Sequence, residues 1–300
     1  YKTKIKFNYM KMYPKLTEKL QNFQPITLTE LNATASFLKR IDRKFLLNSK
    51  QFSEVIAELK EEFQVLEIAG KKVFSYDNVY MDTNDYLFYN QHQNKQKSRT
   101  KVRTRYYVDS NLAFFEYKQK NKWVTNKYRY QFPSEEHGFM TRGKKRFFDW
   151  VWQSLYAGEN APNITPSIKT NYKRITMVSK NWEERLTIDF DVKATDLRKK
   201  WAKVVDLKNL VIIESKSLKE KCIACKIMKK NNIEQASSCS KYSLGVVYSG
   251  LAEKFDTFKE TMERIKEIRM ETIKSVKRTT SLNNITKQFA KEITKIKDAA

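Results

Sequence analysis

The sequence is poor in the residues of loop-rich or cross-linked scaffolds, with only 6 glycines, 5 prolines and 3 cysteines in 300 residues. So few glycines and prolines argue against a chain made mainly of turns. Three cysteines exclude an even-numbered disulfide framework and suit a reducing, cytoplasmic location. Cys222 and Cys225 have no nearby histidine, which favours ordinary cysteines on a helix over a zinc site.

Long apolar runs are also missing. No stretch approaches the roughly 18 apolar residues of a membrane-spanning helix. The basic N-terminus lacks the apolar core of a signal peptide. These absences lead us to expect a protein that neither spans a membrane nor is secreted.

Positive charge is what the sequence has in excess. There are 59 Lys and Arg against 34 Asp and Glu, which gives a formal net charge of +25. Hydrophobic residues make up 40% of the chain, with 18 Phe and 16 Tyr, enough for a folded core. A surplus of this size indicates an anionic partner, and composition leaves nucleic acid, an acidic membrane and polyphosphate open.

The hydrophobic periodicity predicts short helices alternating with many strands. Helices are expected at 27–39, 50–63, 145–156, 217–230 and 251–268, and strands at 40–47, over most of 65–132, and at 167–177, 184–192, 209–216 and 240–247. No linker divides the middle of the chain. We therefore expect one α+β domain at 26–268, built on an antiparallel sheet or barrel, with a basic lead-in at 1–25 and a loosely attached basic tail at 269–300.

Several predicted strands carry charge on one face. Alternate residues of a strand share a face, so Arg99, Lys101, Arg103 and Arg105 lie together. A solvated face is the simplest interpretation, because antiparallel sheets commonly expose one side. Four cations in a row repel one another, however, unless an anion lies among them. If helices cover the apolar faces, a barrel would turn these cations inward, where Arg and Lys can bind a phosphate chain.

Acidic residues on such faces raise the question of a metal. Glu214, and then Glu116 and Asp189, could hold a divalent cation that bridges phosphates to the protein, or could pair with neighbouring arginines. His92 precedes the cationic strand and is either a phosphate contact or a loop histidine.

An ordered set of motifs between about residues 27 and 268 resembles the VTC domain, the polyphosphate polymerase branch of the triphosphate tunnel metalloenzymes, in its stand-alone bacterial type. The motifs are RIDRKF (40–45), YMDTNDYLFY (80–89), RTKVRTRYY (99–107), FFEYKQK (114–120), KYR (127–129), NYKR (171–174), ERLTIDFD (184–191), LVIIESK (210–216) and CSKYSLGV (239–246). Each motif is weakly specific, and their order carries the resemblance.

The resemblance implies an eight-stranded antiparallel tunnel flanked by helices. It implies phosphate binding by Lys44, Arg103, Arg105, Lys118, Lys127, Arg174, Arg185 and Lys241, hydroxyl contacts from Tyr172 and Ser240, and metal binding by Glu214. The family transfers the γ-phosphoryl group of ATP to polyphosphate with Mn²⁺ or Mg²⁺. ATP and polyphosphate or triphosphate are therefore the expected partners, with no specific nucleic acid.

Two residues of the first strand depart from the family pattern: Asp42 stands where the family often has Glu, and Phe45 replaces the usual Tyr. No membrane segment accompanies the domain, so a membrane partner is not encoded in this chain. A triphosphatase with the same tunnel, a polyphosphate binder without turnover and a nucleic-acid-binding protein remain alternatives to the polymerase.

Overall fold

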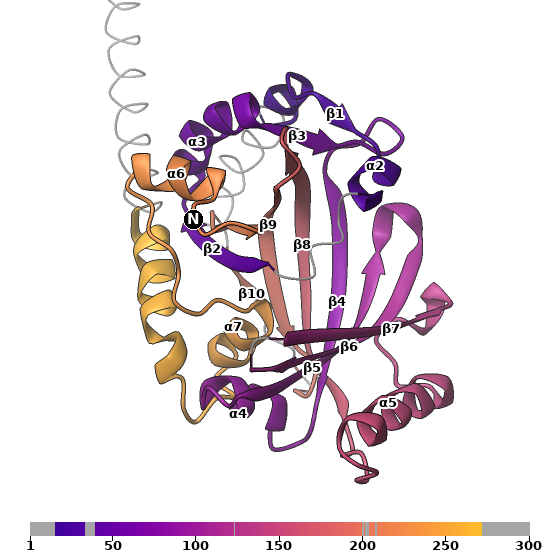
Figure 1. The fold of residues 1–300 in the computed structure, drawn as a ribbon. Helices are drawn as coiled ribbons and strands as arrows, with labels where there is room; N and C mark the ends of the chain where they lie inside the picture. The colour runs from indigo at the N-terminus through magenta and orange to yellow at the C-terminus, as the bar shows by residue number, and fades with distance from the viewer. Residues whose placement is uncertain are drawn as a thin grey trace, which may run out of the picture.

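The computed structural model describes residues 16–33, 40–122, 124–199, 201, 204–207 and 209–271. Its centre is a path of eight antiparallel strands flanked by helices (Figure 1). In sheet order they are β2 (Ile41–Leu47), β11 (Val211–Ser217), β9 (Glu184–Asp196), β8 (Thr165–Ser179), β4 (Phe74–Asp82), β5 (Ser98–Tyr107), β6 (Leu112–Asn121) and β7 (Val124–Phe132). The predicted α+β fold on an eight-stranded antiparallel sheet is thereby confirmed.

Shorter elements complete the sheet and surround it. β1 (Pro25–Ile26) pairs with β3 (Phe63–Leu66), β3 pairs with β8, and β10 (Val204–Asp206) pairs with β9. The helices are α2 (Leu28–Ala33), α3 (Ser49–Glu62), α4 (Leu87–Gln93), α5 (Arg142–Leu155), α6 (Ile223–Lys230) and α7 (Lys241–Tyr248), and residues 16–21 and 259–271 are also helical. No helix in these described ranges combines the length and apolar character needed to cross a bilayer.

Helices cover the apolar face of the sheet, as the alternation predicts. Asn48 and Gln51 cap the start of α3 reciprocally, and α3 then buries Phe52 and its neighbours in a core shared with Ile188 of β9. α5 covers the other half of the sheet, where Phe148 packs in the core that includes Phe115 and Tyr117 of β6. The charged residues that alternate with these core positions are left on the opposite face.

The sheet is strongly curved. Four strands separate β2 from β5 in the sheet. Even so, Lys44 Nζ of β2 lies 2.8 Å from the carbonyl oxygen of Cys239, and Lys101 Nζ of β5 lies 3.0 Å from Ser240 Oγ. Lysines from both halves of the sheet thus contact the adjacent residues Cys239 and Ser240. Figure 1 shows β5, β6 and β7 crossing the long strands β4 and β8. Among the described strands, β2 and β7 are not paired, so the sheet is barrel-like and open.

One predicted strand is wrong, because residues 240–247 form most of the helix α7. The alternation of Tyr242, Leu244 and Val246 imitates a strand, but nearly every side chain of this short helix is buried, so it has no polar face from which to read a helical period. Ser240 accepts a hydrogen bond from the backbone of Ser243 and caps the helix. α7 packs on the concave face against β8 and β9 and covers part of it.

Other differences concern boundaries and the cysteines. α4 interrupts the strand-rich region 65–132. The predicted helix start at residue 217 is wrong, because residue 217 ends β11 and α6 begins only at residue 223. Cys222 and Cys225 form a disulfide with a Cα–Cα distance of 5.1 Å, which the prediction of unlinked cysteines missed. Cys222 is the N-cap residue of α6, and three residues later the first helical turn brings Cys225 back beside it.

The ends of the predicted domain are described only in part. Leu16, Leu20 and Phe23, within the expected lead-in, are buried in the main core with α3 and β9. Residues 1–15 and the tail from 272 onward lie outside the described residues.

Replacing Gly245 with Ala is expected to destabilise the protein by about 1–3 kcal/mol, the usual cost of overpacking a core. A Cβ at this position would lie 2.5 Å from Cγ2 of Ile168, a fully buried side chain of β8. Denaturant unfolding would measure the loss. Gly143→Ala in α5 is the control, since its Cβ comes no nearer than 3.3 Å to Tyr130 Oη and Ala favours a helix. Equal stability of the two variants would contradict the close contact.

Candidate functional site

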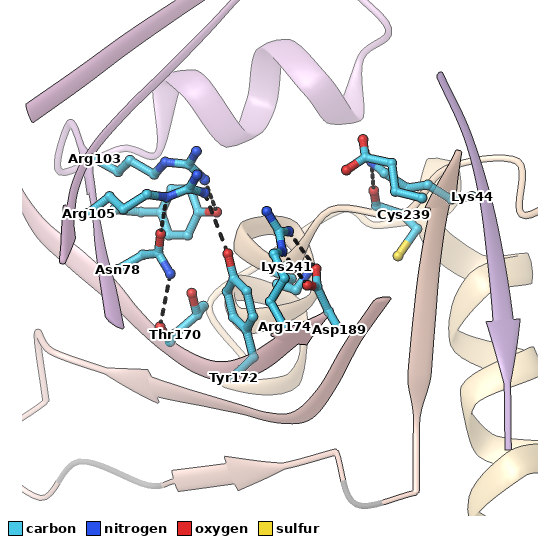
Figure 2. A network of polar contacts seen from close by, with 12 residues as sticks. Lys44, Asn78, Arg103, Arg105, Thr170, Tyr172, Arg174, Asp189, Cys239 and Lys241 are labelled. Carbon is cyan, nitrogen blue, oxygen red and sulfur yellow. Dashed lines mark hydrogen bonds and ion pairs between the residues drawn. The ribbon is translucent and has the colours of Figure 1, made fainter. Parts of the chain in front are cut away.

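The cationic row on β5 lies on the concave face, as its alternation predicts. Arg103 donates to Tyr80 Oη at 3.1 Å, and Arg105 donates to Asn78 Oδ1 at 2.9 Å and to Tyr172 Oη at 3.5 Å. Figure 2 shows these side chains pointing toward the groups of β8, β9 and α7. Each guanidinium is therefore held in place on the concave face.

A buried carboxylate organises the first group of cations. Glu116 of β6 is 2% exposed and lies opposite Arg103 in the sheet register. Arg103 Nη2 and Lys127 Nζ each lie 2.6 Å from its oxygens, and Arg105 Nε lies 3.8 Å away. Burial by itself would raise the pKa of Glu116, but the three cations hold this pKa far below its usual value. Glu116 is thus an ionised anchor for cations from β5 and β7.

A second buried carboxylate, Asp189 of β9, anchors cations from β8 and α7. Arg174 of β8 makes a bidentate pair with Asp189 of β9, at 2.6 and 2.8 Å, and Lys241 of α7 donates to the same carboxylate. Burial opposes ionisation of Asp189, yet Arg174 and Lys241 keep its pKa below the usual range. Although α7 was predicted as a strand, Lys241 still lies in the site, because its helix begins against the sheet.

Aromatic rings separate the arginines of the two groups. Tyr76 of β4 lies between Arg105 and Arg174, with its ring centroid 5.4 and 4.9 Å from their Cζ atoms, and it stacks on Tyr172 at 5.3 Å. A ring between two guanidinium groups attracts both through its π face. The sequence interpretation missed Tyr76 with its β4 neighbours Asn78 and Tyr80. These three residues alternate along β4, and this strand periodicity could have placed them on one face.

A third group consists of lysines without a strong carboxylate partner. We name Lys44, Lys101, Lys118 and Lys216 the lysine cluster. Burial, and then the neighbouring cations, lower the pKa of Lys101 well below normal, and burial with the charge of Lys216 lowers the pKa of Lys118 to about 8. The charges that act on Lys118 of β6 include Lys44 of β2 and Lys216 and Glu214 of β11. Lys216 was absent from the predicted site.

His92 and Ser240 lie behind the lysine cluster. The two ring nitrogens of His92 are 3.2 Å from Ser243 Oγ and 3.4 Å from Ser238 Oγ, and the ring packs edge-on to Phe258. Burial, followed by the charge of Lys101, lowers the pKa of His92 to about 2, so the imidazole is neutral. In this arrangement His92 supports the start of α7, and Ser240 Oγ accepts a hydrogen bond from Lys101.

Arg185 and Arg99 lie at two other positions of the concave face. Arg185 of β9 is opposite Lys216 of β11 in register, and its pKa is lowered by burial and then by Arg174. Arg99 lies opposite Lys120, near the start of β5, and burial also lowers its pKa. Both therefore add to the uncompensated positive charge.

The three carboxylates considered for a metal have different partners. Glu116 and Asp189 are each surrounded by cations, whereas Oε1 of Glu214 lies 3.8 Å from Lys44 Nζ. Burial opposes ionisation of Glu214, but Lys44 and then Lys216 hold its pKa well below normal. The described residues contain no cluster of three His, Cys, Asp or Glu side chains that could hold a metal. Glu214 alone fits the kind of Mg²⁺ site in which one carboxylate binds the ion together with phosphate oxygens and water.

Tripolyphosphate affinity is expected to fall as pH rises above about 8. The pKa of Lys118 is about 8 without a ligand, so this amine is protonated below that pH and neutral above it. Anion binding favours the protonated amine and raises its pKa, so Lys118 takes up a proton when the anion binds. The affinity that this charge contributes is lost at higher pH. Calorimetry between pH 7 and 9.5 would measure it. Lys118→Arg should flatten the profile, since Arg stays charged; an unchanged slope would contradict the assignment.

One protein-family model matches more than half of the chain. The family model of the VTC domain matches residues 39–249. No curated protein gives a significant match. Among solved structures, the PH1819 protein from Pyrococcus horikoshii OT3 is 14% identical with a TM-score of 0.40, covering 70% of this chain and 99% of that one. HpAC1 from Hippeastrum, an adenylyl cyclase candidate described as having a dominant triphosphatase activity, is 12% identical with a TM-score of 0.39, covering 72% and 99%. At such scores these two likenesses carry no functional argument.

Proposed function

Since the chain belongs to the VTC domain family, we propose that it transfers the γ-phosphoryl group of ATP to a polyphosphate chain on its concave face. The observation that carries this proposal is the run of inward-facing cations from β5 through β6 and β8 to α7. A nucleic-acid-binding surface would instead present its cations on an outer face with exposed aromatic residues. Here the cations are partly buried, and buried carboxylates and tyrosines hold them in place.

Phosphoryl transfer depends mainly on positioning and on charge neutralisation, and the site offers both. In our proposal Arg103, Arg105, Lys118 and Arg174 hold the triphosphate. Glu116 and Asp189 fix the guanidinium groups before substrate arrives, so little reorganisation is needed during the reaction.

The acceptor chain is assigned to the remaining cations. Lys127, Arg185 and Lys241 would guide the end of the polyphosphate toward the γ-phosphorus, while Lys44, Arg99 and Lys101 neutralise charge along it. Tyr172 and Ser240 offer hydroxyl groups on the same face, and His92 acts by supporting Ser243. Glu214 would hold Mn²⁺ or Mg²⁺, which when bound neutralises charge on the phosphate oxygens.

Incubation with ATP and Mn²⁺ or Mg²⁺, followed by gel electrophoresis, tests the proposal. We expect polyphosphate that lengthens with time, together with ADP in equal amount to the phosphoryl groups transferred. Release of orthophosphate from ATP or tripolyphosphate without chain growth would replace the polymerase with a hydrolase. Tight tripolyphosphate binding with neither chain growth nor orthophosphate release would indicate a polyphosphate-binding protein without turnover.

A further inference from the structure

The disulfide at the start of α6 lies outside the phosphate site and has one accessible side. Cys222 is 1% exposed and belongs to the main core, whereas Cys225 is half-buried. Cys225 lines a surface pocket of about 490 Å³ together with Arg43, Lys229 and Ile233. A reagent from solution therefore meets the sulfur of Cys225 before that of Cys222.

The helix start can accommodate the thiolate that would leave. Cys222 is the N-cap of α6, and the backbone N–H of Cys225 donates to its Sγ at 3.0 Å. Such a backbone donor at a helix N-terminus can hydrogen-bond the sulfur that receives the electron pair. The buried cysteine thus has a donor for the departing electron pair, and the half-buried one is the accessible target.

Hydrogen bonds join the segment around the disulfide to the sheet. Arg43 of β2 donates to the carbonyl oxygen of Glu220 at 2.7 Å, in the segment that leads from β11 to Cys222. Glu184 of β9 accepts from the backbone of Ile223 at 2.6 Å and from Ser215 Oγ of β11 at 2.7 Å. The first turn of α6 is therefore fastened to the strand that carries Glu214 and Lys216.

We propose that Cys222 and Cys225 form a thiol–disulfide exchange site that low-molecular-weight thiols reach through the pocket beside Cys225. A thiolate attacks Sγ of Cys225, the bond between the two cysteines breaks, and the electron pair leaves on Cys222, which is then protonated. A second thiolate attacks the external sulfur of the mixed disulfide, and the electron pair leaves on Cys225, which releases the oxidised external thiol pair. Two electrons pass from the two external thiols to the protein. This proposal does not depend on the phosphoryl-transfer reaction.

The test is native alkylation of the full chain followed by peptide mass spectrometry. After oxidation with glutathione disulfide, we expect neither Cys222 nor Cys225 to react with iodoacetamide. After dithiothreitol under native conditions, Cys225 should be alkylated first and Cys222 more slowly. Cys239 is 7% exposed and should react only after unfolding in both samples, so it is the internal control. Alkylation of both cysteines in the oxidised protein would overturn the proposal.

Single variants separate the two sulfurs. In Cys222→Ser, glutathione disulfide should add one glutathione to Cys225, whereas in Cys225→Ser the buried Cys222 should stay unmodified. Equal modification of the two variants would contradict the proposed direction of attack. Reduction of the wild-type protein should also lower its melting temperature by a few degrees, about the effect of opening a short disulfide loop. An unchanged melting temperature in a sample shown to be reduced would contradict a stabilising role of the disulfide in the first turn of α6.

Discussion

Lys118→Met is expected to lower the rate of polyphosphate synthesis by about 10²–10³-fold, the loss seen when one stabilising donor is removed from a charged transition state. The same change should raise the melting temperature of the ligand-free protein. Burial and Lys216 already disfavour the charge of Lys118, as its lowered pKa shows, so an apolar side chain of similar length relieves repulsion. Steady-state kinetics and thermal unfolding of the same preparation would measure both effects.

The opposite signs of the two effects separate a functional lysine from a structural one. Lys60→Met on the exposed surface of α3 is the matched control and should change neither quantity appreciably. A Lys118→Met protein that is both less stable and fully active would contradict the proposed site. A normal rate with a raised melting temperature would place the phosphate chain elsewhere on the concave face.

Glu116→Gln is expected to destabilise the protein by about 3–5 kcal/mol, because it leaves the largely buried Arg103 and Arg105 without their carboxylate. Glu116 is 2% exposed and contacts Arg103 and Lys127 at 2.6 Å, so water cannot replace it at these positions without rearrangement. Denaturant unfolding without ligand would measure the loss. Glu253→Gln, at an exposed position between α7 and the last described helix, is the control.

Tripolyphosphate should restore more stability to Glu116→Gln than to the wild type. A bound anion supplies the negative charge that the variant lacks, and ligand binding to the folded state adds stability by mass action. The melting-temperature shift with tripolyphosphate should therefore be larger in the variant. A smaller shift than in the wild type would mean that Glu116 serves the phosphate chain directly, for example through a metal, and would contradict its role as an anchor.

Strand periodicity was enough to place most of the site residues on one face. The alternation in 99–105 predicts the shared direction of Arg103 and Arg105, which the contacts with Tyr80 and Asn78 confirm. Such a prediction succeeds because a strand has a period of two whatever surrounds it. The same rule failed at α7, since a helix buried on all sides shows no period of its own.

The sequence by itself determined that strands predominate and that several of them share a charged face, and its positive surplus indicates an anionic ligand. Only the tertiary structure decided which carboxylates hold which cations, because Glu116 and Asp189 gain their partners from neighbouring strands and from α7. It also distinguished the compensated arginines from the lysine cluster, in which burial and charges far apart in the chain lower the pKa values of Lys101 and Lys118. Local periodicity records the direction of a side chain, whereas its charge state depends on everything that the fold brings near it.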